Sequence, residues 1–352
     1  MKALRWHGRR DLRYEDVPEP SPGLGEVKLK VLWASICGSD VQEYESGPIF
    51  LSVEPNPLTG RQAPLTIGHE FSAQVVELGP GVDSLRVGDR VVGECIYSCG
   101  GCFFCNTGVP YMCQKVAHLG FHTDGAFAEY FTAPAKALYL VPDTISDEIA
   151  AVTEPLAVGV HSVLRSRLKI GDSAVVVGAG AIGISTILAA RAAGASHVYA
   201  LTRSQKRAEK ALKFGASAVI NPNKEDAVAR IRELTGGRGA DASFDCAGAK
   251  VTGPLAIELA RNQGSVVIVG MSPEPSPDFN FISIATTEKV ITGAIAYYGE
   301  RATVLDLIAD GRLNPAGFIS KKIALKNAVR DGFEELLKNP ADYLRIIVKP
   351  GA

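Results

Sequence analysis

The sequence has no long apolar run and no marked excess of charge. No stretch approaches the roughly 18 consecutive apolar residues of a membrane-spanning helix, so none is expected. Met1–Arg10 has no apolar core of the signal-peptide type, which makes export unexpected and a cytoplasmic protein the expectation. A net charge of −1 gives no reason to expect nucleic acid or an anionic membrane as a partner. Internal repeats and low-complexity segments are also missing.

What is present is the composition of a globular protein with clustered cysteines. The 352 residues are enough for two domains of ordinary size, each with its own core. Hydrophobic residues make up 46% of the chain and charged residues 21%. Seven cysteines, several of them close together, indicate metal binding rather than disulfides in a chain that is not exported.

The segment Ser173–Gly183 has the pattern of a dinucleotide-binding turn. A β-branched run, Ala174–Val177, predicts a strand buried on both faces. Three glycines at G-x-G-x-x-G spacing follow it and open a helix expected over Ile184–Ala193. The glycines permit a tight turn, close approach of a pyrophosphate to bare backbone, and close helix–strand packing. We assign Gly178, Gly180, Ile182 and Gly183 to cofactor binding.

The rest of the chain changes character twice. Short strand-like runs with Gly and Pro turns fill residues 1–150, which predicts a mostly β domain. Strands and helices alternate over residues 151–290, which predicts a Rossmann domain, a doubly wound parallel sheet of the α/β class. The turn-rich character returns over residues 291–352. The cofactor domain is therefore expected to be inserted into a domain built from both ends of the chain.

Four cysteines lie at C-x2-C-x2-C-x7-C spacing in a glycine-containing segment: Cys99, Cys102, Cys105 and Cys113. Four thiolates so spaced can close a tetrahedral structural zinc site. A zinc ribbon that binds nucleic acid would have two separated C-x2-C pairs in basic, aromatic surroundings, which are missing here. Ligation of an iron–sulfur cluster stays open as an alternative, although the spacing matches no common pattern.

A second set of candidate metal ligands is scattered along the chain: Cys37 in C-G-S-D, His69 and Glu70 in G-H-E, and Glu154 in T-E-P-L. Mixed thiolate, imidazole and carboxylate ligands with one position left open are typical of a catalytic zinc. Each residue alone would more often be structural. Their joint occurrence with a dinucleotide-binding pattern favours the metal.

In order and content these motifs resemble the zinc-dependent medium-chain dehydrogenases, over essentially the whole chain. The resemblance rests on the C-G-S-D turn, G-H-E, the four-cysteine lobe and the glycine loop. It implies a GroES-like catalytic domain beside the Rossmann domain. Glu154–Leu156 resembles the polyol branch, in which a glutamate is the third zinc ligand or its close neighbour. Tyr44–Gly60 resembles the substrate-side loop of butanediol dehydrogenases.

The resemblance also implies roles for the residues. A zinc held by Cys37, His69 and Glu154 would act as a Lewis acid on the substrate oxygen, while hydride passes between the carbinol carbon and nicotinamide. Glu70 is either a fourth ligand in the resting state or a neighbour that helps exchange the metal's water. Ser39 stands where the family has a hydroxyl that takes the alcohol proton.

The chain departs from that pattern at Gln42, where related enzymes often have a histidine that ends the proton relay. Glutamine cannot titrate, so the relay is expected to end in the cofactor ribose and water, or in another group. His118, His122 and His161 are open candidates.

The residues after the second Rossmann strand favour NADP(H) over NAD(H). Thr202 occupies the position, about 20 residues beyond the glycines, where NAD-binding chains have a carboxylate for the ribose. Arg203 follows, and Arg207 lies one turn on. An arginine offers a 2′-phosphate paired hydrogen bonds, and no carboxylate repels it. An exposed basic start of a helix is the alternative, and the polyol branch is commonly NAD-linked.

The expected function is therefore zinc-dependent oxidation of a secondary alcohol, foremost a vicinal diol or acyloin such as 2,3-butanediol and acetoin. A sorbitol-type polyol dehydrogenase is the alternative among enzymes. A catalytically silent NADP-binding zinc protein is the alternative from another class, and the intact Cys37, His69 and Glu154 argue against it. The resemblance also implies a homodimer or homotetramer, joined through sheet edges near Ile291–Tyr297.

Overall fold

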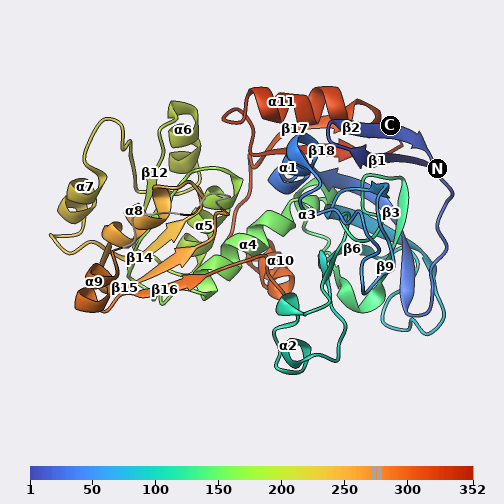
Figure 1. Cartoon of the computed structure of the whole chain (residues 1–352), viewed down its shortest axis with the longest axis horizontal. Coiled ribbons are helices and arrows are strands. Elements are labelled where there is room, and N and C mark those ends of the chain that lie inside the picture. The colour runs from blue at the N-terminus through green and yellow to red at the C-terminus, as the bar shows by residue number, and fades with distance from the viewer. Residues whose placement is uncertain (272–274, 276–279, 352) are drawn as a thin grey trace. The chain divides into compact units, whose positions relative to one another are not determined.

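The computed structural model describes residues 1–271, 275 and 280–351. It separates into two compact units (Figure 1). Unit 1 comprises Met1–Glu154, Arg301–Leu305 and Ala316–Ala352; unit 2 comprises Pro155–Glu300 and Asp306–Pro315. The chain thus enters unit 2 after Glu154 and first returns to unit 1 at Arg301. The sequence predicted these two boundaries at residues 151 and 291. The predicted α/β fold class is confirmed, and unit 1 contains both ends of the chain.

Unit 2 is a six-stranded sheet in which every neighbouring pair is parallel. In spatial order the strands are β13 (Ala218–Ile220), β12 (His197–Leu201), β11 (Ser173–Val177), β14 (Ala240–Asp245), β15 (Ala260–Ile268) and β16 (Val290–Gly293). The strand order changes direction beside β11, as in a doubly wound sheet. Helices α5 (Ala181–Ala192), α6 (Gln205–Lys213), α8 (Thr252–Leu259) and α9 (Phe281–Thr287) contact its strands (Figure 1), and α7 (Ala227–Leu234) packs on α8. Helices α4 (Thr153–Leu164) and α10 (Glu300–Ala309) each have residues in both units.

The central strand of this sheet explains why the segment folds as it does. Val175 and Val176 are fully buried, and Val177 nearly so, because helices cover the sheet where β11 lies. β-branched side chains fit such a pleated, two-sided interior. Val175 and Val177 pack with Tyr199, Leu201 and residues of α7 and α8 in one apolar cluster. The buried strand that the sequence predicted is therefore the middle of the cofactor unit.

Unit 1 is mostly β, as predicted. Its main sheet runs β10 (Leu138–Leu140), β6 (Arg90–Gly93), β5 (Glu70–Leu78), β3 (Glu26–Ser35), β18 (Arg345–Lys349) and β17 (Ile319–Ala324), with β9 (Tyr130–Pro134) also paired to β3. Smaller sheets join β2 (Asp11–Asp16), β1 (Lys2–Gly8) and β4 (Leu65–Thr66), and β7 (Ile96–Tyr97) with β8 (Ala117–His118). Its α-helices are α1 (Gly38–Ser46), α2 (Phe103–Asn106), α3 (Asp147–Ala151) and α11 (Glu334–Lys338).

The C-terminal segment completes the main sheet of unit 1. β18 lies antiparallel to β3, with Ile347 opposite Ser35, and parallel to β17. On its other side β3 pairs with β5, with Ser35 opposite Glu70. The end of β3 is therefore flanked by the start of β5 and by a strand from the far end of the chain.

One local expectation needs correction. Cys37–Asp40 is the start of helix α1 rather than a turn, with Cys37 as the N-cap and the Asp40 carboxylate accepting the Cys37 backbone N–H at 2.9 Å. Strand β6 begins at Arg90, after a turn in which Gly88 adopts a φ of 101°. No helix in the described part of the chain is both long and apolar enough to cross a membrane.

Candidate metal centres and cofactor site

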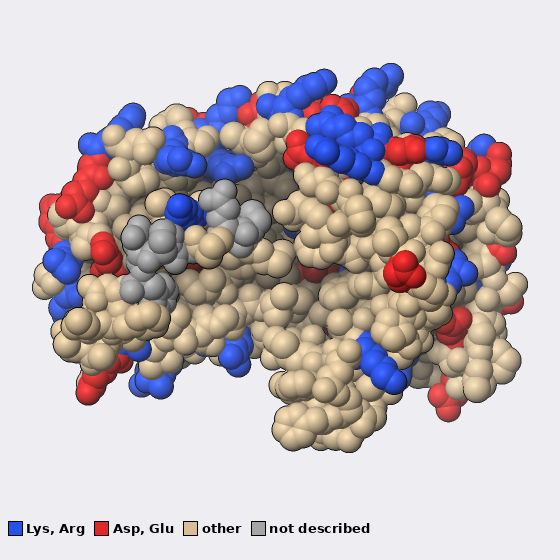
Figure 2. Space-filling view, in the orientation of Figure 1, with Lys and Arg blue, Asp and Glu red and all other residues tan. Residues whose placement is uncertain are grey.

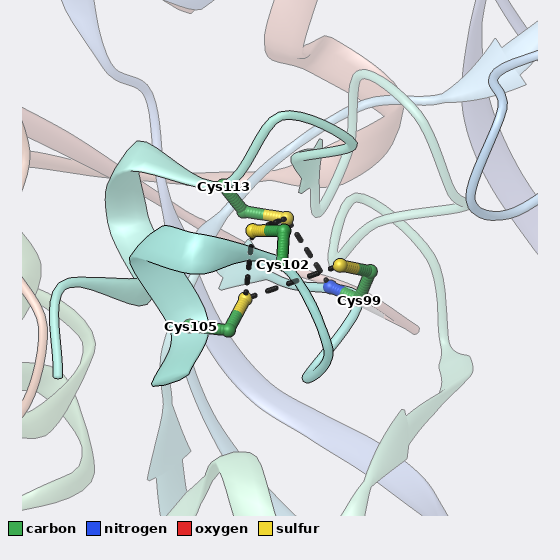
Figure 3. Close-up of side chains that lie close together, drawn as sticks. All are labelled: Cys99, Cys102, Cys105 and Cys113. Carbon is green, nitrogen blue, oxygen red and sulfur yellow. Dashed lines mark hydrogen bonds between the residues drawn. The ribbon is translucent and has the colours of Figure 1, made fainter. Parts of the chain in front are cut away.

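The four clustered cysteines converge in one lobe of unit 1. Their sulfur atoms all lie within 4.8 Å of one another (Figure 3). The Sγ–Sγ distance is 3.5 Å between Cys102 and Cys105 and 3.8 Å between Cys102 and Cys113. Residues 95–114 contain no Lys, Arg, Asp or Glu, and the lobe around α2 is accordingly without charge in Figure 2. The predicted four-thiolate site therefore forms, and its donor set fits zinc.

The second metal group is assembled where β3 and β5 pair. Cys37 follows the end of β3, and His69 and Glu70 stand at the start of β5. One ligand atom from each of these three residues lies within 4.8 Å of the others. Gly68 makes this corner possible, because a Cβ there would lie 2.7 Å from the ring of Phe127. One thiolate, one imidazole and one carboxylate form a donor set that fits a catalytic zinc.

Asp40, which was not among the predicted site residues, lies beside the histidine of this group. His69 Nδ1 lies 3.5 Å from Asp40 Oδ1, and both side chains are buried. The other ring nitrogen, Nε2, lies 3.5 Å from Ser39 Oγ. Burial lowers the pKa of His69, while the Asp40 carboxylate and Cys37 raise it, and the net result is a pKa well above the usual value. A carboxylate behind a metal-binding histidine fixes the ring and its tautomer. The sequence signal that could have identified Asp40 is its place as the third residue of a helix.

Glu70 and Glu154 have different surroundings. Both oxygens of Glu70 accept hydrogen bonds from Arg345, and burial, which raises the pKa of Glu70, is outweighed by this cation, so the pKa is lowered. Glu154 lies outside the three-residue group, and its Oε1 accepts the Cys95 thiol at 3.8 Å. Burial and the charge of Glu70 raise the pKa of Glu154 to about 7. Two buried carboxylates beside a thiol form surroundings that a divalent cation would stabilise.

Two arginines near this group, Arg345 and Arg301, were not among the site residues predicted from the sequence. Arg345 comes from β18, and Arg301, which is fully buried, donates to Thr153 Oγ1 at 2.6 Å beside Glu154. The Arg301 charge acts to lower the pKa of Glu154. No local pattern marks either residue, because each reaches the site only through tertiary folding.

The histidines considered for the proton relay have other surroundings. Burial, together with the nearby imidazoles, lowers the pKa of His118 to about 4, so it is neutral at physiological pH. His122 Nδ1 accepts the backbone N–H of His118 at 3.0 Å. His161, in unit 2, pairs with Glu300 Oε1 at 2.6 Å. Gln42 is exposed on α1.

The glycine loop of unit 2 has the geometry of a phosphate cradle. Gly178 has a φ of 94°, which favours glycine. A Cβ on Gly183 would lie 1.8 Å from the carbonyl oxygen of Gly178, so only glycine lets α5 pack this closely on β11. Gly180 is the N-cap of α5, and a Cβ there would meet nothing within 4 Å. The helix thus opens with bare backbone facing free space, next to Ile182, and fits a pyrophosphate.

At the end of β12, Thr202 is buried and Arg203 is exposed. Ser204 caps α6, its Oγ accepting the Arg207 backbone N–H at 3.4 Å. Burial and the neighbouring Arg203 cation lower the pKa of Arg207, so the two guanidinium groups lie within electrostatic reach of each other. Asn221 Nδ2 donates to the Arg203 carbonyl at 3.4 Å, which joins this loop to the end of β13. A depression beside them is lined by Thr202, Ser204, Gln205, Ala208, Leu212, Val219, Asn221 and Lys224.

Comparison with known families agrees with this architecture. Residues 23–143 match the alcohol dehydrogenase GroES-like domain, and residues 181–310 match the zinc-binding dehydrogenase family. The chain is 40% identical to (R,R)-butanediol dehydrogenase of Bacillus subtilis, covering 99% of this chain and all of that protein. It is 37% identical to a sorbitol dehydrogenase of Halalkalibacterium halodurans, covering 86% of this chain and 84% of that protein.

Among solved structures, that of 2R,3R-butanediol dehydrogenase from Bacillus subtilis superposes with a TM-score of 0.94 at 39% identity, covering 99% of both chains. The GroES-like match spans both metal groups, so the four-cysteine lobe is the structural zinc site and the group of Cys37, His69 and Glu70 belongs to the catalytic one. The chain belongs to the zinc-containing medium-chain alcohol dehydrogenases, which use a nicotinamide cofactor.

Proposed function

We propose that this enzyme interconverts a vicinal diol and the corresponding acyloin, with 2,3-butanediol and acetoin as the model pair. The observation that carries the proposal is the group of Cys37, His69 and Glu70 in a chain that matches a butanediol dehydrogenase over its full length. A zinc ion held at Cys37 and His69 would supply a Lewis acid for the substrate oxygen, and a bound nicotinamide would supply the hydride acceptor.

The protein residues divide the remaining work. Cys37, His69 and Glu154 are the proposed zinc ligands. To bind zinc, Glu154 would have to give up the hydrogen bond that its Oε1 accepts from the Cys95 thiol at 3.8 Å. Glu70 is the proposed neighbour that assists ligand exchange, since Arg345 already occupies both of its oxygens. Ser39 is proposed to take the hydroxyl proton and pass it to the cofactor ribose and water. Its position 3.5 Å from His69 Nε2 supports that role.

A substrate panel tests this proposal. We expect kcat/KM for 2,3-butanediol oxidation to exceed that for 2-butanol by about tenfold or more, because a polar site rejects an analogue that lacks a matched hydroxyl. It should also exceed that for sorbitol, whose chain is longer. Loss of activity on chelation and its return with zinc would tie turnover to the metal. A higher kcat/KM for sorbitol would instead support the polyol alternative, which the 37% identical sorbitol dehydrogenase favours.

We propose NADP(H) as the preferred cofactor. Arg203 and Arg207 supply two neighbouring cations, and Thr202 leaves no carboxylate to repel a 2′-phosphate. Lys224 and Asn221 line the adjoining depression and add one cation and one amide. Two arginines close together repel each other, so a bound phosphate would relieve that repulsion as well as accept hydrogen bonds.

The cofactor proposal is tested with Arg203→Ala. We expect the KM for NADPH to rise about tenfold, which is the loss of one charge-assisted contact, while the KM for NADH stays unchanged. Arg230→Ala is the matched control, since Arg230 is a half-exposed arginine of the same unit that pairs with Glu233. A wild-type preference for NADH would show that Arg203 is simply a surface residue.

We further propose a homo-oligomer joined at the open edge of the cofactor sheet. β16 is the last strand of that sheet among the described residues, and the exposed Ile295 and Tyr298 follow it. An unpaired strand edge flanked by apolar side chains favours pairing with a second copy. Light scattering would show a dimer or tetramer if this holds and a monomer if it does not.

A further inference from the structure

Glu43 is a fully buried carboxylate on α1, the helix that starts at the zinc ligand Cys37 and carries Ser39. Within the described residues, no lysine, arginine or histidine forms an ion pair with it. Burying a carboxylate without a cation is costly unless hydrogen bonds replace its hydration. The surroundings of Glu43 therefore have to supply several donors.

The donors are consecutive backbone groups of one loop. Glu43 Oε2 accepts the N–H of Phe50 at 2.7 Å, of Ile49 at 3.1 Å and of Leu51 at 3.3 Å, and Oε1 shares the Ile49 N–H at 3.1 Å. Gly47 allows this approach, because a Cβ there would collide with the same carboxylate. The negative charge is thus compensated only while residues 49–51 wrap around it.

The backbone of Glu43 fixes the same turn. Its carbonyl oxygen accepts the Gly47 N–H at 2.9 Å and the indole N–H of Trp6 at 3.2 Å. Glu43 therefore contacts residues 47–51 through both its side chain and its backbone.

An aromatic contact connects this loop to the zinc ligand. The Phe50 ring packs on Phe121 with centroids 5.5 Å apart, and Phe121 packs on the His69 ring at 5.2 Å. The Ser52 N–H points to the Phe121 carbonyl at 3.4 Å, and Thr59 Oγ1 donates to the His122 carbonyl at 2.6 Å. These contacts hold Phe50, Ser52 and Thr59 against residues 121–122, next to His69.

We propose that Glu43 is a positioning residue that sets substrate size: its carboxylate holds residues 49–51 so that Phe50 and Phe121 form a fixed apolar wall beside His69. The wall suits the short alkyl groups of a four-carbon diol and excludes longer chains. The proposal rests on the proposed function, which places a small secondary alcohol at this zinc.

Glu43→Gln tests the proposal with little change of shape. Glutamine offers one acceptor oxygen where three N–H groups converge, and its own N–H2 faces a donor. We expect the KM for 2,3-butanediol to rise about tenfold with kcat changed less than about threefold, because the chemical groups are untouched. The ratio of kcat/KM for 2,3-butanediol to that for 2,3-hexanediol should fall by a similar factor.

Glu45→Gln is the matched control. It removes the same charge from the same helix, but Glu45 is about half exposed and pairs with Arg10 rather than with the loop. Both variants should retain wild-type zinc content, and Glu45→Gln should retain the wild-type substrate ratio. An unchanged ratio in Glu43→Gln would overturn the proposal.

A double-mutant comparison shows whether Glu43 acts through Phe50. Phe50→Ala should lower the same substrate ratio, and adding Glu43→Gln should cause no further fall, because the wall is already gone. Independent, additive effects would contradict positioning through Phe50. Phe50→Ala also tests the wall by itself should Glu43→Gln prove unable to fold.

Hydrogen exchange gives a readout that needs no turnover. In the zinc-loaded enzyme the amides of residues 49–51 should be protected, and Glu43→Gln should speed their exchange at least about tenfold, while Glu45→Gln should not. Equal exchange in all three proteins would overturn the anchoring. If exchange is fast in Glu43→Gln but the wild-type enzyme turns over no diol, the anchoring of residues 49–51 by Glu43 stands and the proposed function is wrong.

Discussion

Glu70 and Arg345 form a two-pronged ion pair at the catalytic zinc group although they stand 275 positions apart in the chain. Arg345 Nε and Nη2 each donate to one Glu70 oxygen at 2.9 Å, and both side chains are buried. The pair exists because β18 lies against β3 at the point where β3 also meets β5. The C-terminal strand thus supplies the cation that holds Glu70 ionised.

Arg345→Met should destabilise the protein by about 3–5 kcal/mol, because it leaves the Glu70 carboxylate buried without its cation. Urea unfolding measures the loss. Adding Glu70→Gln should restore part of it, since the neutral amide no longer needs a partner. An Arg345→Met protein as stable as the wild type would contradict the pairing.

Cys102→Ser should lose one of two zinc ions per chain and lower Tm, because a structural zinc contributes directly to folding free energy. Metal analysis of purified protein measures the zinc content. Cys246→Ser is the control, since Cys246 lies outside both metal groups and near Thr186. A wild-type content of one zinc per chain would revive a catalytically silent protein as the alternative.

Ser39→Ala should lower kcat by about 10²-fold with little change in zinc content, because the hydroxyl proton loses its first acceptor. The kcat–pH profile should lose the limb that reports this proton transfer. Gln42→Ala, on the exposed side of the same helix, should leave kcat unchanged. A kcat within threefold of wild type in Ser39→Ala would remove Ser39 from the relay.

Asp241 should make stability depend on acid pH. Burial raises its pKa, but Arg261 at 2.6 Å and the two Ser173 donors outweigh this and lower the pKa below its usual 3.8. A lowered pKa means that the stabilisation is complete above about pH 4 and is lost as pH falls through the folded-state pKa. The Tm difference between wild type and Asp241→Asn should therefore be largest near neutral pH and shrink below it. A constant difference would contradict this assignment.

Local patterns in the sequence predicted the parts of the site that depend on spacing. Three glycines, a buried Val run and four cysteines each dictate their own geometry within a dozen or so residues. The gathering of Cys37 and His69 was predicted from their chemistry and resemblance, and the β3–β5 pairing supplies its cause.

What could not be predicted are the partners contributed by distant folding. Arg345 reads as an ordinary strand residue, and only its pairing across the sheet brings it to Glu70. Glu43 reads as a solvated helix residue, and only the loop that wraps it turns it into a buried anchor. The start of α1 was misread as a turn, although an Asp at its third position is a capping signal.

The most direct test of the central account is acetoin reduction measured against zinc occupancy, with metal-stripped enzyme reloaded stepwise and NADPH and NADH assayed side by side. We predict that turnover rises with occupancy of the Cys37–His69 site, is greater with NADPH, and is absent in Cys37→Ser, which keeps one zinc per chain. Turnover that is independent of zinc, or no turnover of acetoin at two zinc ions per chain, would contradict the account.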